Sequence, residues 1–158
     1  MVIATQYHLK LLEEKLHQAN YDPFKLRLLE KLITEDAQDT LSKFMIGTKL
    51  DEILFRHVIG GVLARARKNK RPVRAFGEMV VLLLAKGLPD TTLQLEHLWN
   101  DLKQSEAFSL FCAYPRSVFS KNSEAILNVC GAHSKIVAPV DASAKNVLYK
   151  DLSFNTNN

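Results

Sequence analysis

Short apolar runs alternate with amphipathic segments along most of the chain. The β-branched run at residues 2–5 (VIAT) predicts a first strand. Apolar residues then recur every three or four positions, which predicts a helix with inward-facing Leu9, Leu12, Leu16 and Ala19. Pro23 suits the first turn of a short second helix, and KLIT at 31–34 predicts the next strand.

Two further helices begin at recognisable capping residues. Asp36 is placed to cap a helix that carries Leu41, Phe44 and Met45. Thr48, followed three residues later by Asp51, resembles a capping box. It predicts a helix to about residue 68, with an apolar face formed by Leu54, Val58 and Gly61.

The same alternation continues in the second half of the chain. RPVRAF (71–76) predicts a third strand, and EMVVLLLAKG (78–87) predicts a buried helix that ends at Gly87. Asp90 is a candidate cap for a helix with inward-facing Leu95, Leu98, Trp99 and Leu102. Three further elements are expected: a strand at 107–114, a short helix at 123–130 and a fifth strand at 134–139.

This order of strands and helices predicts an α/β domain. Its mostly parallel sheet of about five strands should be flanked by helices. We assign residues 1–141 to this domain and the polar residues 142–158 to a C-terminal tail. No internal repeat or linker divides the chain.

Composition narrows the class of protein. The chain has 158 residues, 47% of them hydrophobic and 24% charged, enough for one core and too apolar for a disordered chain. No apolar run approaches the roughly 18 residues of a membrane span, and no signal peptide is recognisable. Cys112 and Cys130 are too few for a disulfide scaffold. We expect a cytoplasmic protein with reduced thiols and no membrane partner.

A basic cluster accounts for much of the net charge of +4. Five of the seven residues from Arg65 to Arg71 are basic. Cations at the end of a helix are favoured by its dipole. No aromatic side chains interleave with the cluster, as a stacking surface for nucleic acid requires. Binding of nucleic acid through residues 65–74 is therefore a third-ranked hypothesis.

Candidate chemistry gathers where predicted strands end, because ligands of open parallel sheets bind beyond the carboxyl ends of the strands. Glu78 follows the strand that contains Arg74, and Cys112 and Tyr114 close the next one. Two readings of Arg74 and Glu78 stay open: a structural ion pair, or contacts to a ligand. Cys112 on its own is typical of a small buried apolar residue.

Catalytic and metal motifs are weak. Cys130 and His133 form a C-x-x-H pair, but two ligands do not make a metal site. A Cys–His hydrolase would need Cys112 beside His133, and the two fall at opposite ends of a predicted helix. GTKLDE (47–52) lacks the earlier glycine of a phosphate loop. We expect no enzyme, no metal and no cofactor.

Four ordered blocks resemble a known family. They are FMIGTKLDEILFRHVIGGVLARA, RPVRAFGEMVVLLLAKG, LQLEHLWNDL and FSLFCAYPRSVF. VIATQYHLKLLEEKL and LITEDAQDTLSKF also fit the earlier part of that family's domain. Over residues 2 to 139 the chain resembles the MEDS domain, the sensory domain of DcmR found in methanogens and methylotrophs.

The resemblance implies a RecA- or KaiC-like α/β fold without a working phosphate loop. It also implies a prokaryotic sensory role, in which a small organic molecule, such as a simple hydrocarbon derivative, is bound. The signal would pass to a histidine kinase or a DNA-binding regulator. The chain shows neither output segment, so we expect a separate output protein. The alternative function is a RecA-like nucleotide-binding or hydrolytic enzyme.

Three matching blocks supply site residues. RAFGEM contributes Arg74, Phe76, Gly77 and Glu78, LEHLWN contributes Glu96 and Trp99, and CAYP contributes Cys112 and Tyr114. With the strand-edge rule, these blocks predict a ligand site formed by Arg74, Phe76, Glu78, Trp99, Cys112 and Tyr114. Family members usually begin with a further strand and helix. We therefore expect an exposed sheet edge that a second copy of the chain can cover.

Overall fold

Four parallel strands form the central sheet, in the order β2-β1-β5-β6. They are β1 (Val2–Ala4), β2 (Thr34–Asp36), β5 (Val73–Gly77) and β6 (Phe108–Cys112). Each neighbouring pair is parallel, so every connection between them is a crossover through helices. The predicted α/β architecture is confirmed. This computed structural model describes residues 1–68, 70–114, 131, 133, 135–139 and 147–151.

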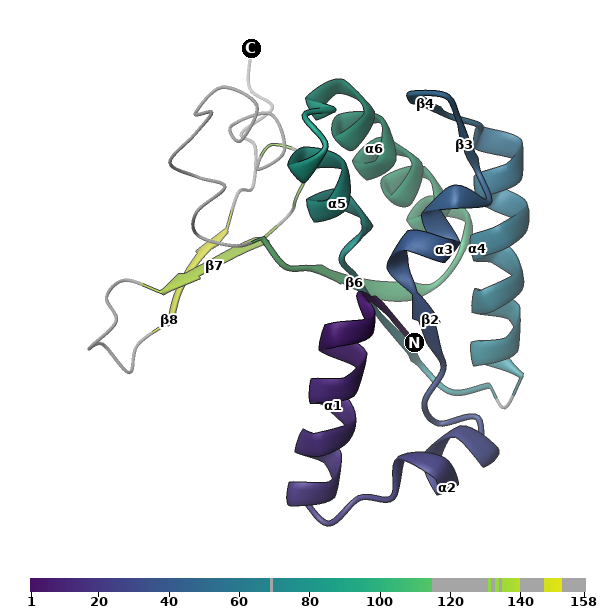
Figure 1. Cartoon of the computed structure of the whole chain (residues 1–158), viewed down its shortest axis with the longest axis vertical. Helices are drawn as coiled ribbons and strands as arrows, with labels where there is room; N and C mark the ends of the chain where they lie inside the picture. The colour runs from purple at the N-terminus through teal and green to yellow at the C-terminus, as the bar shows by residue number, and fades with distance from the viewer. Residues whose placement is uncertain (69, 115–130, 132, 134, 140–146, 152–158) are drawn as a thin grey trace.

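Helices cover the sheet unequally. α1 (Gln6–Gln18) and α2 (Pro23–Leu28) lie on one side. The helices that contact one another to build the main core are α3 (Ala37–Ser42), α4 (Glu52–Arg67), α5 (Met79–Ala85) and α6 (Pro89–Ser105). Figure 1 shows α1 and α2 separated from α5 and α6 by the sheet. A short hairpin of β3 (Met45–Ile46) and β4 (Lys49–Leu50) precedes α4.

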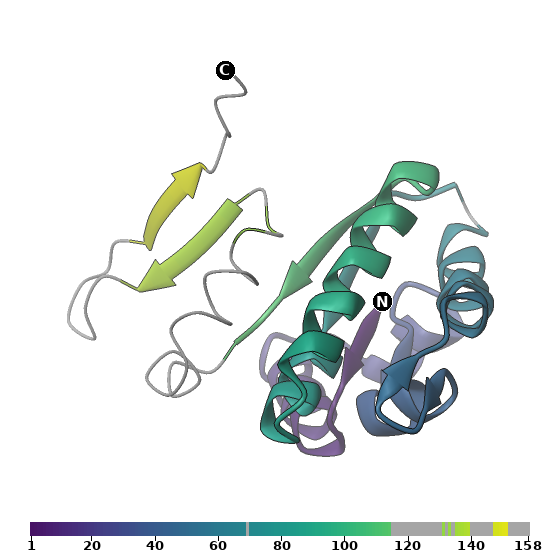
Figure 2. The same ribbon diagram turned by 90° about the horizontal axis from the view of Figure 1, so that it is seen from above.

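The predicted fifth strand forms outside the central sheet. β7 (Lys135–Pro139) pairs antiparallel with β8 (Val147–Asp151). Figure 2 shows this hairpin beyond β6. The central sheet thus has four strands in place of about five, and β8 lies where the sequence predicts a polar tail. The predicted helix at 123–130 lies outside the described residues.

One strand begins later than its apolar run predicts. β2 shares only Thr34 with the predicted strand at 31–34 and continues through the polar Glu35 and Asp36. The carbonyl of Ile33 accepts a hydrogen bond of 2.8 Å from Val2 N–H, so pairing with β1 starts at the end of that run. In the described sheet β2 has one neighbour, and such a strand tolerates polar side chains.

Side-chain caps mark the start of three described helices, α2, α3 and α4. The Asp36 carboxylate accepts from Asp39 N–H at 2.8 Å, which confirms the predicted cap of α3. For α4 the cap is Asp51, which accepts from Leu54 N–H at 2.8 Å, and the predicted role of Thr48 is wrong. α6 begins at Pro89, which places Asp90 inside the first turn, since proline is pre-organised for that first position.

A row of aromatic side chains fills the core between α3, α4 and α6. Phe55 meets Phe44 edge-on, with ring centroids 5.3 Å apart, and meets Trp99 in the same way at 5.4 Å. Phe108 extends the row from β6, with its ring centroid 6.0 Å from that of Trp99. Phe44, Phe55 and Trp99 are each at most 1% exposed. Edge-to-face packing adds stabilisation beyond the area that the rings bury.

Truncating the central ring should destabilise the fold strongly. We expect Phe55→Ala to lower the free energy of unfolding by about 3–5 kcal/mol, because it removes buried surface and leaves a cavity. Urea unfolding followed by circular dichroism measures the change. Ile53→Ala on the same helix is the control: Ile53 is 79% exposed, so its loss should cost under about 0.5 kcal/mol. Equal effects would contradict this account of the core.

The cap of α4 can be tested separately. Asp51→Ala should cost about 1 kcal/mol of unfolding free energy, since the N–H of Leu54 then loses its acceptor. Asp51→Asn keeps an acceptor oxygen and should stay close to wild type in the same urea titration. A loss as large in the asparagine variant would show that the charge of Asp51, and not its hydrogen bond, stabilises the helix.

Candidate functional site

The carboxyl ends of three strands meet at one edge of the sheet. Gly77 at the end of β5 pairs with Ile3 of β1 on one side and with Cys112 of β6 on the other. β2 and β5 flank β1 on opposite sides, so the chain order reverses beside β1. Ligands of open parallel sheets bind at such a switch point. Thr5, after β1, and Glu78, after β5, lie there.

Glu78 is a buried carboxylate with partners from another part of the chain. It is 8% exposed. One of its oxygens accepts from Thr5 N–H at 2.9 Å and from the Thr5 hydroxyl at 3.3 Å. The other lies 2.7 Å from Nδ1 of His8. Because Thr5 precedes the first turn of α1, this carboxylate lies at the amino end of that helix, where its dipole favours negative charge.

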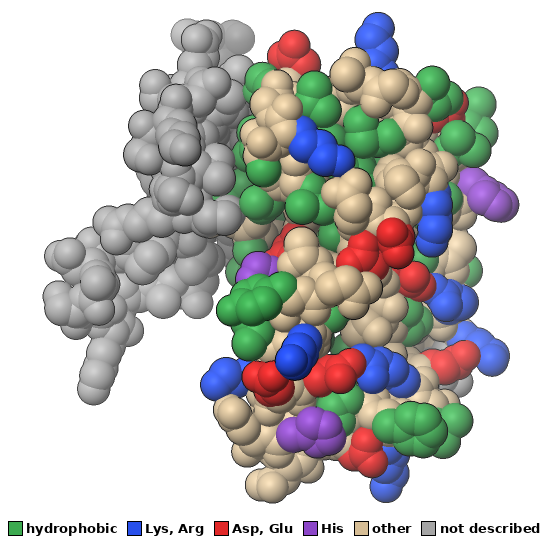
Figure 3. Space-filling view, viewed as in Figure 1, with side chains coloured by type: hydrophobic (Ala, Val, Ile, Leu, Met, Phe, Trp, Pro, Cys, Tyr) green, Lys and Arg blue, Asp and Glu red, His purple; other side chains and the backbone are tan. Residues whose placement is uncertain are grey.

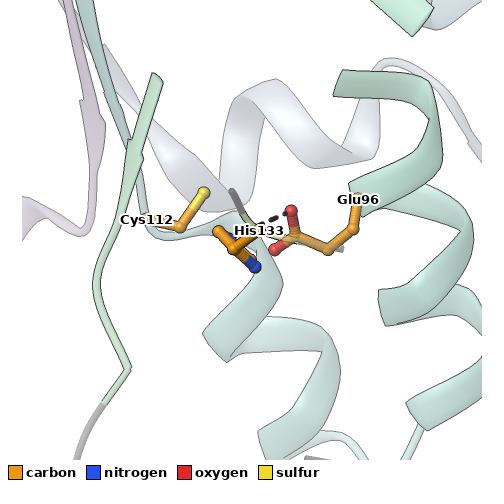
Figure 4. A group of neighbouring side chains, drawn as sticks. All are labelled: Glu96, Cys112 and His133. Atoms are coloured by element: carbon orange, nitrogen blue, oxygen red, sulfur yellow. Dashed lines mark ion pairs between the residues drawn. The ribbon is translucent and has the colours of Figure 1, made fainter. Parts of the chain in front are cut away.

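A second polar cluster lies along the same edge, between α6 and the end of β6. Its centre is Glu96, which is 1% exposed. The Tyr114 hydroxyl donates to Oε1 of Glu96, and Nε2 of His133 lies 3.5 Å from Oε2. Cys112 completes the group: one ligand atom each from Glu96, Cys112 and His133 lie within 4.8 Å of one another (Figure 4).

Burial governs the protonation of this second cluster. It raises the pKa of Glu96, and the nearby His133, the hydroxyl of Tyr114 and His97 oppose that rise. Burial, followed by the charge of Glu96, raises the pKa of the Cys112 thiol. Because the thiolate is the nucleophilic form of cysteine, Cys112 in this environment is a poor nucleophile.

Three of the six predicted ligand residues lie at this edge: Glu78, Cys112 and Tyr114. Arg74 is exposed and lies four residues before Glu78, about 13 Å away along an extended strand. No ion pair joins Arg74 to Glu78 in the described part of the chain, where Glu78 pairs instead with Thr5 and His8.

The other two predicted residues have different surroundings. The ring of Phe76 stacks on that of Phe111, with the ring centroids 5.9 Å apart. Both rings lie on the sheet face opposite the buried Val73 and Ala75. Trp99 is enclosed in the aromatic core.

The predicted ligand site left out Glu96, although the LEHLWN block contains it, and it left out His8 and His133. Glu96 lies three residues before Trp99, a spacing that places it on the inward face of its helix, so this position was recoverable. For His133 the only signal was its C-x-x-H spacing from Cys130, which lies outside the described residues. The expectation that Cys112 and His133 stay apart is wrong, because their ligand atoms lie within 4.8 Å of each other.

The basic cluster is largely engaged in contacts within the chain. Arg65 pairs with Glu35, Arg67 with Glu106, and Lys68 with Glu30 at 3.3 Å. Arg71 donates to the backbone carbonyls of Leu29 and Glu30 at 3.1 and 3.2 Å. On the face in Figure 3, basic and acidic side chains are interspersed. These pairings reduce the positive charge available to phosphate groups.

Two further features bear on the site. A cavity of about 280 Å³ lies at the opposite edge of the sheet, where Met1, Ile33 and Val73 mark the amino ends of the strands. It is therefore remote from both carboxylate clusters. Among the described residues, no helix is both long and apolar enough to cross a bilayer.

Comparison with known proteins identifies the family. A family profile described as MEDS, the methanogen/methylotroph, DcmR sensory domain, matches residues 1–134. No curated protein and no solved structure matches the chain. The match spans the central sheet, the six helices of the described residues and both carboxylate clusters. The protein therefore belongs to the MEDS family of sensory domains.

Proposed function

We propose that this chain senses a small organic molecule by binding it at the carboxyl edge of the sheet and passes the signal to a separate protein. A histidine kinase or a DNA-binding regulator is the expected output partner. Family membership supports the sensory role. The observation that carries the location is the pair of buried carboxylates, Glu78 and Glu96, at one edge.

Buried carboxylates are costly unless each is paired, and their partners here come from distant segments. Glu78 is bound by residues that lie 70 or more positions earlier, and Glu96 by residues after β6. A ligand that competes for either carboxylate must therefore disturb a contact between elements. Cys112, which pairs with Gly77, and Tyr114, which donates to Glu96, supply a polarizable and a polar side chain near these carboxylates.

The helices that begin at Glu78 and Thr5 provide a route for the signal. α5 starts directly after Glu78, and α1 starts directly after Thr5. α1 has no fully buried residue, so it is held to the sheet more weakly than α5, which has three. A ligand that takes hydrogen bonds from Glu78 would move α1 relative to the sheet, and a partner would bind one arrangement better than the other.

Binding can be tested with a panel of simple hydrocarbon derivatives: methanol, methylamine and methanethiol. We expect at least one to raise the thermal midpoint of the wild-type chain. Glu78→Gln should weaken its binding roughly 10- to 100-fold, because a charged acceptor is lost. Isothermal titration calorimetry measures the dissociation constants.

Two variants make that experiment decisive. Glu52→Gln changes an exposed glutamate of α4 and should bind as wild type does. Arg74→Ala should also bind normally, since Arg74 lies away from Glu78. Loss of binding in Arg74→Ala, with the fold intact, would restore its predicted ligand role. Unchanged binding in Glu78→Gln would contradict the site proposed here.

The enzymatic alternative predicts that the chain binds nucleotides, whereas the sensory proposal predicts that it does not. In related sheets a phosphate binds at the amino end of the helix after the first strand. Here the carboxylate of Glu78 already accepts from Thr5 N–H at that position. We therefore expect magnesium–ATP to leave the thermal midpoint unchanged. A ligand at 100 times its dissociation constant would add about 2.7 kcal/mol of stability. A rise of that size would favour the nucleotide-binding enzyme.

A further inference from the structure

Glu96, Cys112 and His133 come from three separate segments, and their side chains converge. Glu96 lies in the second turn of α6, Cys112 ends β6, and His133 precedes β7. Figure 4 shows the thiol and the carboxylate on either side of the imidazole ring. A carboxylate oxygen, a sulfur and a ring nitrogen thus lie within 4.8 Å of one another.

We propose that these three side chains bind a divalent transition-metal ion of the zinc class. The combination of thiolate, imidazole and carboxylate selects such ions, whereas Mg²⁺ and Ca²⁺ prefer oxygen ligands alone. Three protein ligands leave a fourth position open for water or for a small donor molecule. The proposal does not depend on the sensory function proposed above.

The separations are close to those around a tetrahedral ion. Two ligands held about 2.1 Å from zinc at the tetrahedral angle lie about 3.4 Å apart. Nε2 of His133 and Oε2 of Glu96 are 3.5 Å apart. A sulfur and a nitrogen on the same ion lie about 3.6 Å apart. The ligand atoms here lie within 4.8 Å of one another, so the thiol needs to approach by about 1.2 Å at most. A change in side-chain torsion angle supplies a shift of that size.

Tyr114 orients the carboxylate for this role. Its hydroxyl donates to Oε1 of Glu96, which leaves Oε2 directed toward His133. The ring of Tyr114 also packs edge-on against the imidazole, with centroids 6.0 Å apart. Metal-binding carboxylates are commonly held by such hydrogen bonds, which fix the direction of the ligating atom.

Charge balance favours an ion at this position. A dication with one thiolate, one carboxylate and one neutral imidazole makes a site with no net charge, which is the least costly state for a buried cluster. Binding forms a metal–sulfur bond and releases the thiol proton to solvent.

Cobalt titration of the untagged, chelator-treated chain tests the site. We expect one equivalent of Co²⁺ to produce a sulfur-to-cobalt charge-transfer band in the near ultraviolet, and Zn²⁺ to abolish it by competition. Cys112→Ser should lose the band. Tyr114→Phe should keep it but raise the dissociation constant about 10- to 100-fold, and Glu96→Gln and His133→Ala should raise it further.

Matched controls separate this site from other sources of metal binding. Cys130→Ser and His57→Ala should bind Co²⁺ as wild type does, and so should Glu78→Gln, which tests the sensory proposal alone. Circular dichroism confirms that each variant is folded. If Cys112→Ser does not fold, His133→Ala carries the test. The proposal is overturned if no band forms, if His133→Ala binds normally, or if the band survives in Cys112→Ser and disappears in Cys130→Ser.

Discussion

The register of β5 between β1 and β6 determines where Glu78 and Cys112 lie in the candidate site. Gly77 is paired on both sides, so the residue after it cannot shift without breaking two ladders. A slip of one residue would also turn Val73 and Ala75 out of the core. The packing of the helices on this sheet thus fixes Glu78 against the start of α1. The function proposed for this edge therefore depends on a constraint imposed by the core.

The fold was predictable to a large degree because its signals are local. Helical periodicity, the cap at Asp36 and the proline at the start of α2 each act within a few residues. The errors come from longer-range effects. β7 has the apolar composition of a strand in the central sheet, but it pairs with β8. No local sequence pattern distinguishes pairing in the central sheet from pairing with β8. β2 begins later than predicted and includes polar residues, because its start is set by backbone hydrogen bonds to β1.

The site was predictable only in part. The rule that ligands bind at the carboxyl ends of strands located Glu78, Cys112 and Tyr114, because each follows or closes a strand. It does not apply to Arg74, which lies near the start of β5, whereas Glu78 follows the end of that strand. It could not find His133, which lies 21 positions after Cys112 in the sequence but close to it in space. Distances between residues remote in sequence are properties of tertiary structure, which a spacing rule does not contain.

The weak attachment of α1 to the sheet determines which part of the domain opens most easily. The helix has no fully buried residue, and the hydrogen bonds of Thr5 to Glu78 fasten its first turn to the sheet. Its free energy of local opening should therefore lie well below that of the aromatic core. Amide hydrogens in α1 would exchange with solvent through openings that leave the rest of the sheet intact. Under the proposed mechanism, a ligand that contacts Glu78 would change how often the whole of α1 is docked on the sheet.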